Sequence, residues 1–311
     1  MSGRPRREMP LWQSTPLRAL LFLAGLAVTL LPRRWELFLG AWLGRLALLL
    51  ARSRADVARE NIRHCLPELD EDEQERLLKE NFEHYGILTL EILHMLSPFP
   101  GHYREYARRV ARLEGFHHWR AADAKGKGVL FVSAHLGNWE LMAAAGCMAG
   151  IPLNMVTRHL KPEWLHQKID EARKSVKVKA AYLPDTMPSV LRALRRAESV
   201  GFVLDQYAHP PVGVKVPFFG VEVATLGAVP PLALRYGTPI VPVRQVREKN
   251  GFVRIIIEPE LDLGDAKENA IQGTAILAAM VERWIRTHPE QWLWAHRRFK
   301  NVEWPSRSRA A

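Results

Sequence analysis

The stretch "GVLFVSAHLGNWELMAAAG", residues 128–146, combines three kinds of local sequence in one run. "GVLFVSA" (128–134) is a short continuous apolar segment, typical of a strand buried on both faces, and "HLG" forms a turn after it. "NWELMAAAG" begins a helix for which Asn138 supplies a plausible N-cap. A strand, a turn and a helix in this order indicate part of a parallel α/β sheet, which binds ligands at the carboxyl ends of its strands. This stretch therefore predicts both the fold class and the position of a site.

The same alternation of short apolar runs and helical segments continues downstream, so we expect an α/β fold with a mixed sheet flanked by helices. The strands are expected at 128–134, 151–157, 179–183, 200–205, 239–246 and 252–258. The helices between and after them are expected at 138–149, 162–176, 187–198, 225–236 and 266–287. The sequence contains no internal repeat.

The N-terminus contains two apolar stretches, 17–31 and 35–51, with arginines before, between and after them. Fifteen helical residues span roughly 22 Å, which is short of a hydrocarbon core of roughly 30 Å. Extending the first stretch back to Trp12 gives enough length but includes Arg18. Because positive charge lies on both sides, the pattern favours a monotopic element with both ends on one side of a membrane. A single span, a cleaved signal peptide and a buried helical pair of a soluble protein are the alternatives.

These patterns divide the chain into four segments. Residues 53–96 have helical periodicity, and "SPFPG" (97–101) interrupts it. The segments are an N-terminal basic and apolar membrane-associated part (1–52), a helical region packing on the catalytic domain (53–100), the α/β domain (101–302) and a flexible tail (303–311).

The overall charge favours an anionic partner. Lys and Arg number 44 against 33 Asp and Glu, a net charge of +11. No RNP-like, KH or zinc-finger pattern is present, so we do not expect a nucleic-acid partner. Cys65 and Cys147 fit neither a disulfide framework nor a metal site, which favours a reducing, cytoplasmic environment and no bound metal.

His135 and Glu140 are the candidate catalytic pair. If Glu140, in the first helical turn, contacts one nitrogen of the His135 imidazole, the other nitrogen is free to accept a proton, as a general base requires. In the alternative interpretation, Glu140 only complements the helix dipole and His135 is an ordinary turn residue. The spacing alone leaves both open. A serine nucleophile is not indicated, because no G-x-S-x-G elbow occurs and Ser133 lies inside the strand pattern.

The motifs resemble those of a known family. "HLGNWE" resembles the HxGNWE block of the bacterial lipid A late acyltransferases, the lauroyl and myristoyl transferases of lipopolysaccharide biosynthesis, within the wider H-x4-D/E glycerolipid acyltransferase superfamily. "ENIRHCLPEL" and "ENFEHYGILTLEIL" are similar to its N-terminal helical region. "VLDQ" with "VGVKVPFFGVEVATLGAVPPLALRYGTPIVPV" resembles its central region, and "PEQWLWAHRRFK" its C-terminal signature. Together these blocks cover nearly the whole chain in the family's order.

The resemblance implies transfer of a fatty acyl chain from acyl carrier protein to a hydroxyl of a Kdo-bearing lipid A precursor, at the cytoplasmic face of the bacterial inner membrane. His135, oriented by Glu140, would act as base without an acyl-enzyme. Backbone N–H groups of Gly137 and Asn138 are the expected oxyanion donors. No cofactor is implied, because the acyl donor is a co-substrate, either an acyl carrier protein or a CoA thioester.

Further substrate contacts are expected at the ends of neighbouring strands. The family uses an arginine after the second strand; Arg158 and Arg173 both qualify, and spacing favours Arg173. The resemblance also places Asp205 in the site, next to Gln206, although a carboxylate at the end of a strand is commonly a cap.

Two further motifs, one central and one C-terminal, complete the predicted site. Phe218, Phe219 and Gly220 form either a wall near the acyl or acceptor pocket or an anchor in the core. Arg297 and Arg298, in "HRRFK" and close to two tryptophans, suit a membrane interface or a phosphorylated headgroup. Single-stranded nucleic acid would suit the same composition, but the sequence lacks a supporting motif.

Two other functions remain open. The first, in the same class, is acylation of another anionic glycolipid or lysophospholipid, such as a phosphatidylinositol mannoside, from acyl-CoA. The second is a non-catalytic membrane protein whose basic face binds anionic lipid.

Overall fold

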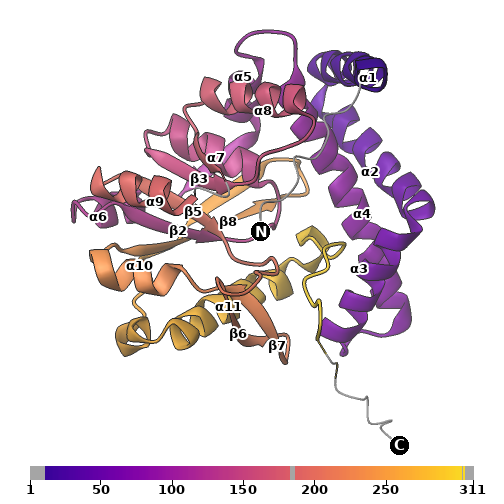
Figure 1. The fold of residues 1–311 in the computed structure, drawn as a ribbon. Helices are drawn as coiled ribbons and strands as arrows, with labels where there is room; N and C mark the ends of the chain where they lie inside the picture. Colours follow the sequence, from indigo (N-terminus) through magenta and orange to yellow (C-terminus); the bar gives the residue numbers. More distant parts are fainter. Residues whose placement is uncertain (1–10, 183–185, 303, 305–311) are drawn as a thin grey trace, which may run out of the picture.

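The computed structural model describes residues 11–182, 186–302 and 304, and its centre is a seven-stranded sheet (Figure 1). The strand order is β1-β9-β8-β2-β5-β3-β4, and neighbours are parallel except for the antiparallel pair β8–β9. The prediction of a mixed α/β sheet is therefore confirmed. The strands are β1 (Ala111–Glu114), β2 (Val129–Ser133), β3 (Leu153–Thr157), β4 (Lys179–Tyr182), β5 (Ser199–Val203), β8 (Ile240–Arg247) and β9 (Val253–Ile257).

Helices cover both faces of the sheet, and β2 shows why. Its residues alternate between two cores: Val129 and Phe131 pack in one, and Leu130 and Val132 in the other. The first core includes α5 (His102–Val110), α6 (Phe116–Asp123), α7 (Trp139–Met148) and α8 (Glu163–Ser175). The second includes α9 (Thr186–Arg195), α10 (Val229–Tyr236), α11 (Ala270–Thr287) and the hairpin of β6 (Gly213–Phe218) and β7 (Val221–Leu226).

A helical wall stands beside the sheet (Figure 1). It consists of α1 (Leu11–Leu30), α2 (Arg33–Leu50), α3 (Arg52–Cys65) and α4 (Glu71–Leu93), followed by the short η1 (His94–Leu96). The helices α2 and α4 approach so closely that a Cβ on Gly44 would overlap the carbonyl oxygen of Phe82. Within the described residues, no helix is both long enough and apolar enough to cross a membrane.

All six expected strands and the expected helices are present, but three strands were not predicted: β1, β6 and β7. The helix expected from residue 225 begins only at Val229, because β7 continues to Leu226. Short 3-10 turns also occur at η2 (Gly264–Glu268) and η3 (Pro289–Gln291). The predicted tail, 303–311, lies outside the described residues except for Trp304.

Candidate active site

His135 lies on the turn after β2 and is held by Asp205, which follows the neighbouring strand β5. The His135 Nδ1 atom is 2.8 Å from Asp205 Oδ1, and the His135 backbone N–H donates to Oδ2, also at 2.8 Å. Because an ionised carboxylate only accepts, Nδ1 carries a proton, and in the neutral ring Nε2 is the nitrogen with the lone pair. The carboxamide nitrogen of Gln206 lies 3.3 Å from Nε2. The ring therefore presents a proton acceptor to the partly exposed side of the site.

Asp205 is buried, with 3% of its surface exposed. The indole N–H of Trp292 donates to its Oδ2 at 2.7 Å. Burial acts to raise the pKa of Asp205, but the charge of His135 and the hydrogen bonds from His135 and Trp292 outweigh it and lower the pKa to about 2. Asp205 therefore stays ionised and is available to stabilise a protonated His135.

Glu140 does not contact His135, so the predicted pairing is wrong. Its carboxylate instead makes a bidentate ion pair with Arg173 of α8, with Nη2–Oε1 at 2.6 Å and Nε–Oε2 at 3.1 Å. The reason is helical geometry: successive side chains point about 100° apart. Trp139 faces His135, with ring centroids 4.9 Å apart, and Glu140 is turned away toward α8.

Of the two candidate arginines, the one that spacing favours is buried and the other is exposed. Arg173, favoured by spacing, is buried against Glu140 and does not face solvent. Arg158 follows β3 directly, is exposed, and makes no ion pair with any residue in the described ranges. Burial, and to a smaller extent the charges of His135 and Arg158, lower the pKa of His296. Arg158 therefore lies close enough to His296 to affect its charge.

The expected oxyanion donors are largely occupied. The Gly137 backbone N–H donates to the Gln291 carbonyl at 3.1 Å, so it is not available as the expected oxyanion donor. Asn138 is the N-cap, as predicted: its side-chain oxygen accepts from the backbone N–H groups of Glu140 and Leu141. Its amide group donates to Glu91 at 2.7 Å. Any role of the Asn138 backbone N–H stays a prediction.

Phe218 and Phe219 are core anchors, one of the two alternatives expected from the sequence. Both are buried, and both rings lie about 6 Å from the ring of Trp292, at 5.9 and 6.1 Å. Phe219 and Gly220 have positive φ angles of 50° and 76° and make the turn of the β6–β7 hairpin. These residues support the site through Trp292, the partner of Asp205, and through Arg298, whose guanidinium lies 5.1 Å from the centroid of the Phe218 ring.

Arg298 is also buried, with 1% of its surface exposed, so its prediction as a headgroup contact is wrong. Its guanidinium donates to the carbonyl oxygens of Gln206 (2.7 Å) and Ala224 (2.8 Å), which fixes the loop after β5 to β7. Burial lowers the pKa of Arg298 to about 10. Arg297 is exposed and makes no ion pair within the part of the chain that the structure describes; it remains available to a substrate.

An apolar cavity lies under α7, beside Trp139. It crosses the sheet from β1 to β3, and its lining includes Phe131, Ala143, Gly146 and Val243. Six neighbouring strands extend over roughly 24 Å at ordinary spacing. The empty cavity is narrow, about 50 Å³, so a chain can enter only when flexible side chains such as Met142 move aside.

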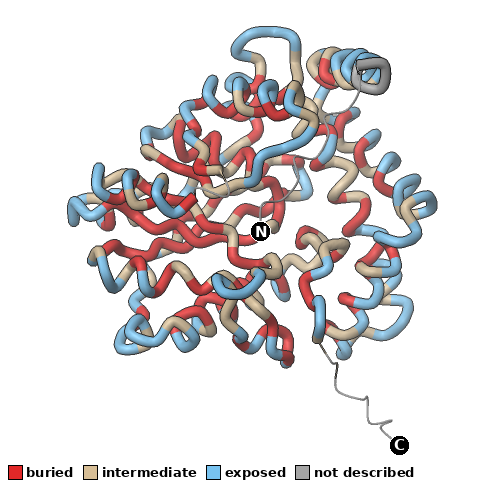
Figure 2. The backbone as a smooth tube through the Cα atoms, viewed as in Figure 1, coloured by how far each residue is buried: buried red, intermediate tan, exposed pale blue. Residues whose placement is uncertain are grey.

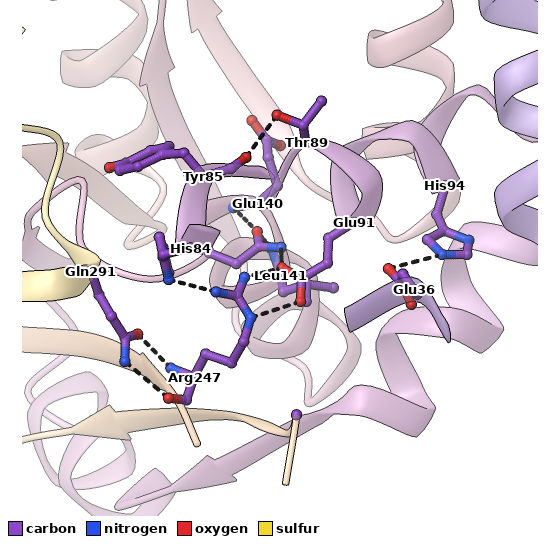
Figure 3. Close-up of polar contacts among 12 residues, drawn as sticks. Glu36, His84, Tyr85, Thr89, Glu91, His94, Glu140, Leu141, Arg247 and Gln291 are labelled. Atoms are coloured by element: carbon purple, nitrogen blue, oxygen red, sulfur yellow. Dashed lines mark hydrogen bonds and ion pairs between the residues drawn. The ribbon is translucent and has the colours of Figure 1, made fainter. Parts of the chain in front are cut away.

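The helical wall is bound to the site through Glu91 of α4 (Figure 3). Its carboxylate accepts from Arg247 of β8, from Arg33 of α2 at 2.6 Å and from Asn138. Burial acts to raise its pKa, but the two arginines lower it to about 2. Gln291 fixes the Arg247 backbone through two hydrogen bonds of 2.7 and 2.9 Å. The N-cap of α7, and with it the turn that bears His135, is thus fixed to the wall.

Trp139, Trp292 and Glu91 were not among the predicted site residues. A signal existed for Glu91: it lies ten residues after Asn81 and seven after His84 in the "ENFEHYGILTLEIL" helix, on the buried face. Charged residues on a buried helix face usually have a partner. Within the described residues, no group of three or more His, Cys, Asp or Glu side chains could hold a metal ion.

Comparison with known proteins defines the class: the molecule is an acyltransferase. The chain belongs to the family of bacterial lipid A biosynthesis acyltransferases, which matches residues 13–301. The resemblance seen in the sequence motifs is therefore confirmed.

Two similar relatives come from Escherichia coli (strain K12). A lipid A biosynthesis lauroyltransferase is 31% identical over 272 residues, covering 84% of both chains. A lipid A biosynthesis palmitoleoyltransferase is 30% identical over 268 residues, covering 85% of this chain and 84% of the relative. A phosphatidylinositol mannoside acyltransferase of Mycolicibacterium smegmatis is 28% identical over 195 residues, covering 57% of this chain and 58% of the relative.

Proposed function

We propose that the protein transfers a fatty acyl chain from an acyl carrier protein thioester to a hydroxyl of a Kdo-bearing lipid A precursor. The observation that carries this proposal is the His135–Asp205 pair, held at the carboxyl edge of the sheet in a chain of the lipid A acyltransferase family. The similarity to two lipid A acyltransferases over more than four fifths of the chain supports the acceptor.

The reaction needs one base and no covalent acyl-enzyme. His135 Nε2 takes the proton of the acceptor hydroxyl as the oxygen attacks the thioester carbonyl. The tetrahedral intermediate then expels the thiolate, which receives the proton from His135. Asp205 keeps Nδ1 protonated and stabilises the transient imidazolium. The carboxamide N–H of Gln206 and the backbone N–H of Asn138 are the candidates for stabilising the oxyanion.

The cavity under α7 suits the acyl chain of the donor. It is lined almost entirely by apolar side chains, and Trp139 lies between it and His135. Burying a hydrocarbon chain contributes roughly 0.8 kcal/mol per methylene. In this arrangement, the thioester carbonyl lies beside Trp139, within reach of an acceptor hydroxyl at Nε2.

The exposed rim suits an anionic acceptor and an acidic carrier. Arg158 and Arg297 are exposed and lack ion-pair partners in the described part of the chain. Unpaired arginines are well suited to phosphate groups. The net charge of +11 favours the encounter with acyl carrier protein.

We also propose that α1 and α2 bind the protein to the cytoplasmic face of the inner membrane. Both helices have exposed faces (Figure 2). Many of the exposed residues carry large apolar side chains, which is unusual for a surface in contact with water. The most exposed are Leu20, Phe22, Leu23 and Leu30 of α1, and Trp35, Phe38, Trp42, Leu49 and Leu50 of α2. Because α2 is packed closely on α4, a membrane bound to this surface would lie at a fixed distance from His135.

The direct test uses the purified full-length protein in detergent with acyl carrier protein thioesters and a Kdo-bearing lipid A precursor. We expect transfer by the wild type and almost none by folded His135→Ala. In cells lacking the protein, mass spectrometry should show lipid A that has lost one acyl chain. An unchanged lipid A profile would contradict the proposed acceptor.

The similarity to phosphatidylinositol mannoside acyltransferases supports a second candidate, transfer from acyl-CoA to another anionic glycolipid or lysophospholipid. The same assay, run with acyl-CoA and mannosylated phosphatidylinositol, separates the two. If no donor supports transfer and anionic lipid is only bound, a non-catalytic lipid-binding protein is the better account.

A further inference from the structure

A second groove lies away from His135, between α1 and the first turns of α8. We call it the α1–α8 groove; its lining includes Arg18, Phe22, Leu96, Trp164, Lys168 and Glu171. Its volume is about 540 Å³. It shares none of its lining with the cavity under α7 and contains no residue assigned above to acyl transfer.

One side of the groove offers hydrogen-bond donors that the protein itself does not use. The Arg18 guanidinium lies 5.2 Å from the centroid of the Trp164 ring and makes no ion pair within the described residues. The indole nitrogen of Trp164 is buried and has no hydrogen-bond partner among them. Lys168 is paired with Glu171 at 2.8 Å. The groove therefore has a net positive charge, carried by Arg18, with two kinds of free N–H donor.

The other side is apolar and continues into the exposed surface of α1. Leu21, Phe22, Leu96 and Pro98 line it. Phe22 is also half exposed, at 52%, next to the exposed Leu23. A cationic end and an apolar end in one groove match an amphiphile with an anionic head.

We propose that the α1–α8 groove binds one phospholipid with an anionic headgroup, its phosphate on Arg18 and its tails along Phe22 and Leu96. The indole N–H of Trp164, which is buried in the free protein, donates to the phosphate only after the ring turns toward the groove. The inference rests on the proposed membrane association of α1 and α2. It adds headgroup selectivity to a surface that would otherwise bind any bilayer. A zwitterionic headgroup carries the same phosphate, so the selectivity comes from its additional ammonium group, which the positive charge of Arg18 disfavours.

The test uses the full chain in a nonionic detergent and monomeric short-chain lipid, which removes the surface potential of a bilayer. Dihexanoyl phosphatidylglycerol and dihexanoyl phosphatidylcholine are titrated by calorimetry, each below its critical micelle concentration. We expect one saturable site that prefers phosphatidylglycerol. Arg18→Gln should weaken its binding about tenfold, the lower end of the range for a hydrogen bond to a charged group.

Arg34→Gln is the matched control, because Arg34 is also exposed, lies on α2 and makes no ion pair with a described residue. Trp164→Phe keeps an aromatic ring but removes the N–H, so binding should fall less than in Arg18→Gln. No saturable binding, or an equal loss in Arg18→Gln and Arg34→Gln, would overturn the proposal.

A readout of acyl transfer separates this inference from the proposed function. With detergent-dispersed substrates, Arg18→Gln should transfer at the wild-type rate while binding phosphatidylglycerol more weakly. If transfer falls in parallel with binding, the groove is part of the acceptor site and the phospholipid assignment is wrong. If the wild type transfers nothing but binds the lipid selectively, only the proposed function fails.

Discussion

Two buried carboxylates lie on opposite sides of the first turn of α7, and their partners differ: one holds a histidine of the site and the other a buried arginine. On one side, Asp205 holds the ring of His135, whose other nitrogen faces the partly exposed site. On the other, Glu140 is enclosed with Arg173 between α7 and α8. Trp139 packs against the His135 ring, whereas the next residue, Glu140, faces α8, because successive side chains of a helix point about 100° apart. A carboxylate at a suitable sequence distance from a histidine therefore need not be its partner.

The largest effect should come from His135→Ala. Without its base, transfer should fall by about a thousandfold or more, within the range of general-base catalysis. The side chain is 18% exposed and contacts the buried Asp205, so its removal should lower the thermal unfolding midpoint. The variant should still fold, because the backbone N–H of residue 135 and the indole of Trp292 continue to bind the carboxylate. Single-turnover transfer and circular dichroism measure the two quantities. If the folded variant still transfers acyl chains at the wild-type rate, His135 is not the general base.

Asp205→Asn should produce the next largest loss, about a hundredfold in kcat with little change in KM. An asparagine keeps the shape but does not stabilise the imidazolium or fix the tautomer. Steady-state kinetics on the folded variant give both constants. A loss confined to KM would instead indicate that Asp205 binds substrate.

Glu140→Ala should act mainly on stability. It leaves the Arg173 guanidinium buried without a partner, which costs about 3–5 kcal/mol of unfolding free energy. Transfer per folded molecule should fall less than in Asp205→Asn. The double variant Glu140→Leu with Arg173→Met is the control: it should recover most of the stability in chemical denaturation. A double variant as unstable as the single one would show that the ion pair is not the cause.

The smallest expected effect is on the free energy of unfolding at low pH. The pKa of Asp205 in the folded protein, about 2, lies below its ordinary value of 3.8. Its stabilising contribution is therefore fully present above that ordinary value and is lost as the pH falls toward 2, about 2 kcal/mol in all. Asp205→Asn should flatten the decline in unfolding free energy between pH 5 and pH 2. Asp265→Asn is the control, because Asp265 is exposed; its unfolding free energy should decline as in the wild type. If the unfolding free energy of Asp205→Asn declines equally, the lowered pKa of Asp205 is not the cause.

The sequence predicted the sheet well because β2, β3, β5 and β8 are buried strands with clear breaks between them. It missed the hairpin from Gly213 to Leu226, since glycines and prolines there resemble a loop until the two strands pair. The N-cap Asn138 was predictable because capping is local.

The site was harder to predict because its partners come from distant segments. His135 and Asp205 are 70 residues apart and meet only because β2 and β5 are neighbours in the sheet. Trp292 reaches Asp205 from 87 residues away. The burial of Arg173 and Arg298 depends on packing, and an exposed and a buried arginine look alike in sequence. Only Glu91 left a local signal, a charge on the buried face of a helix.

The protonation state of the His135 ring nitrogens tests the central claim most directly. With 15N-labelled histidine, NMR should show Nδ1 protonated and Nε2 unprotonated in the wild type and in Glu140→Gln at a pH where the ring is neutral. In Asp205→Asn this preference should be lost, while Glu140→Gln retains it. If Glu140→Gln changes the tautomer and Asp205→Asn does not, Glu140 is the partner of His135 and the account is wrong.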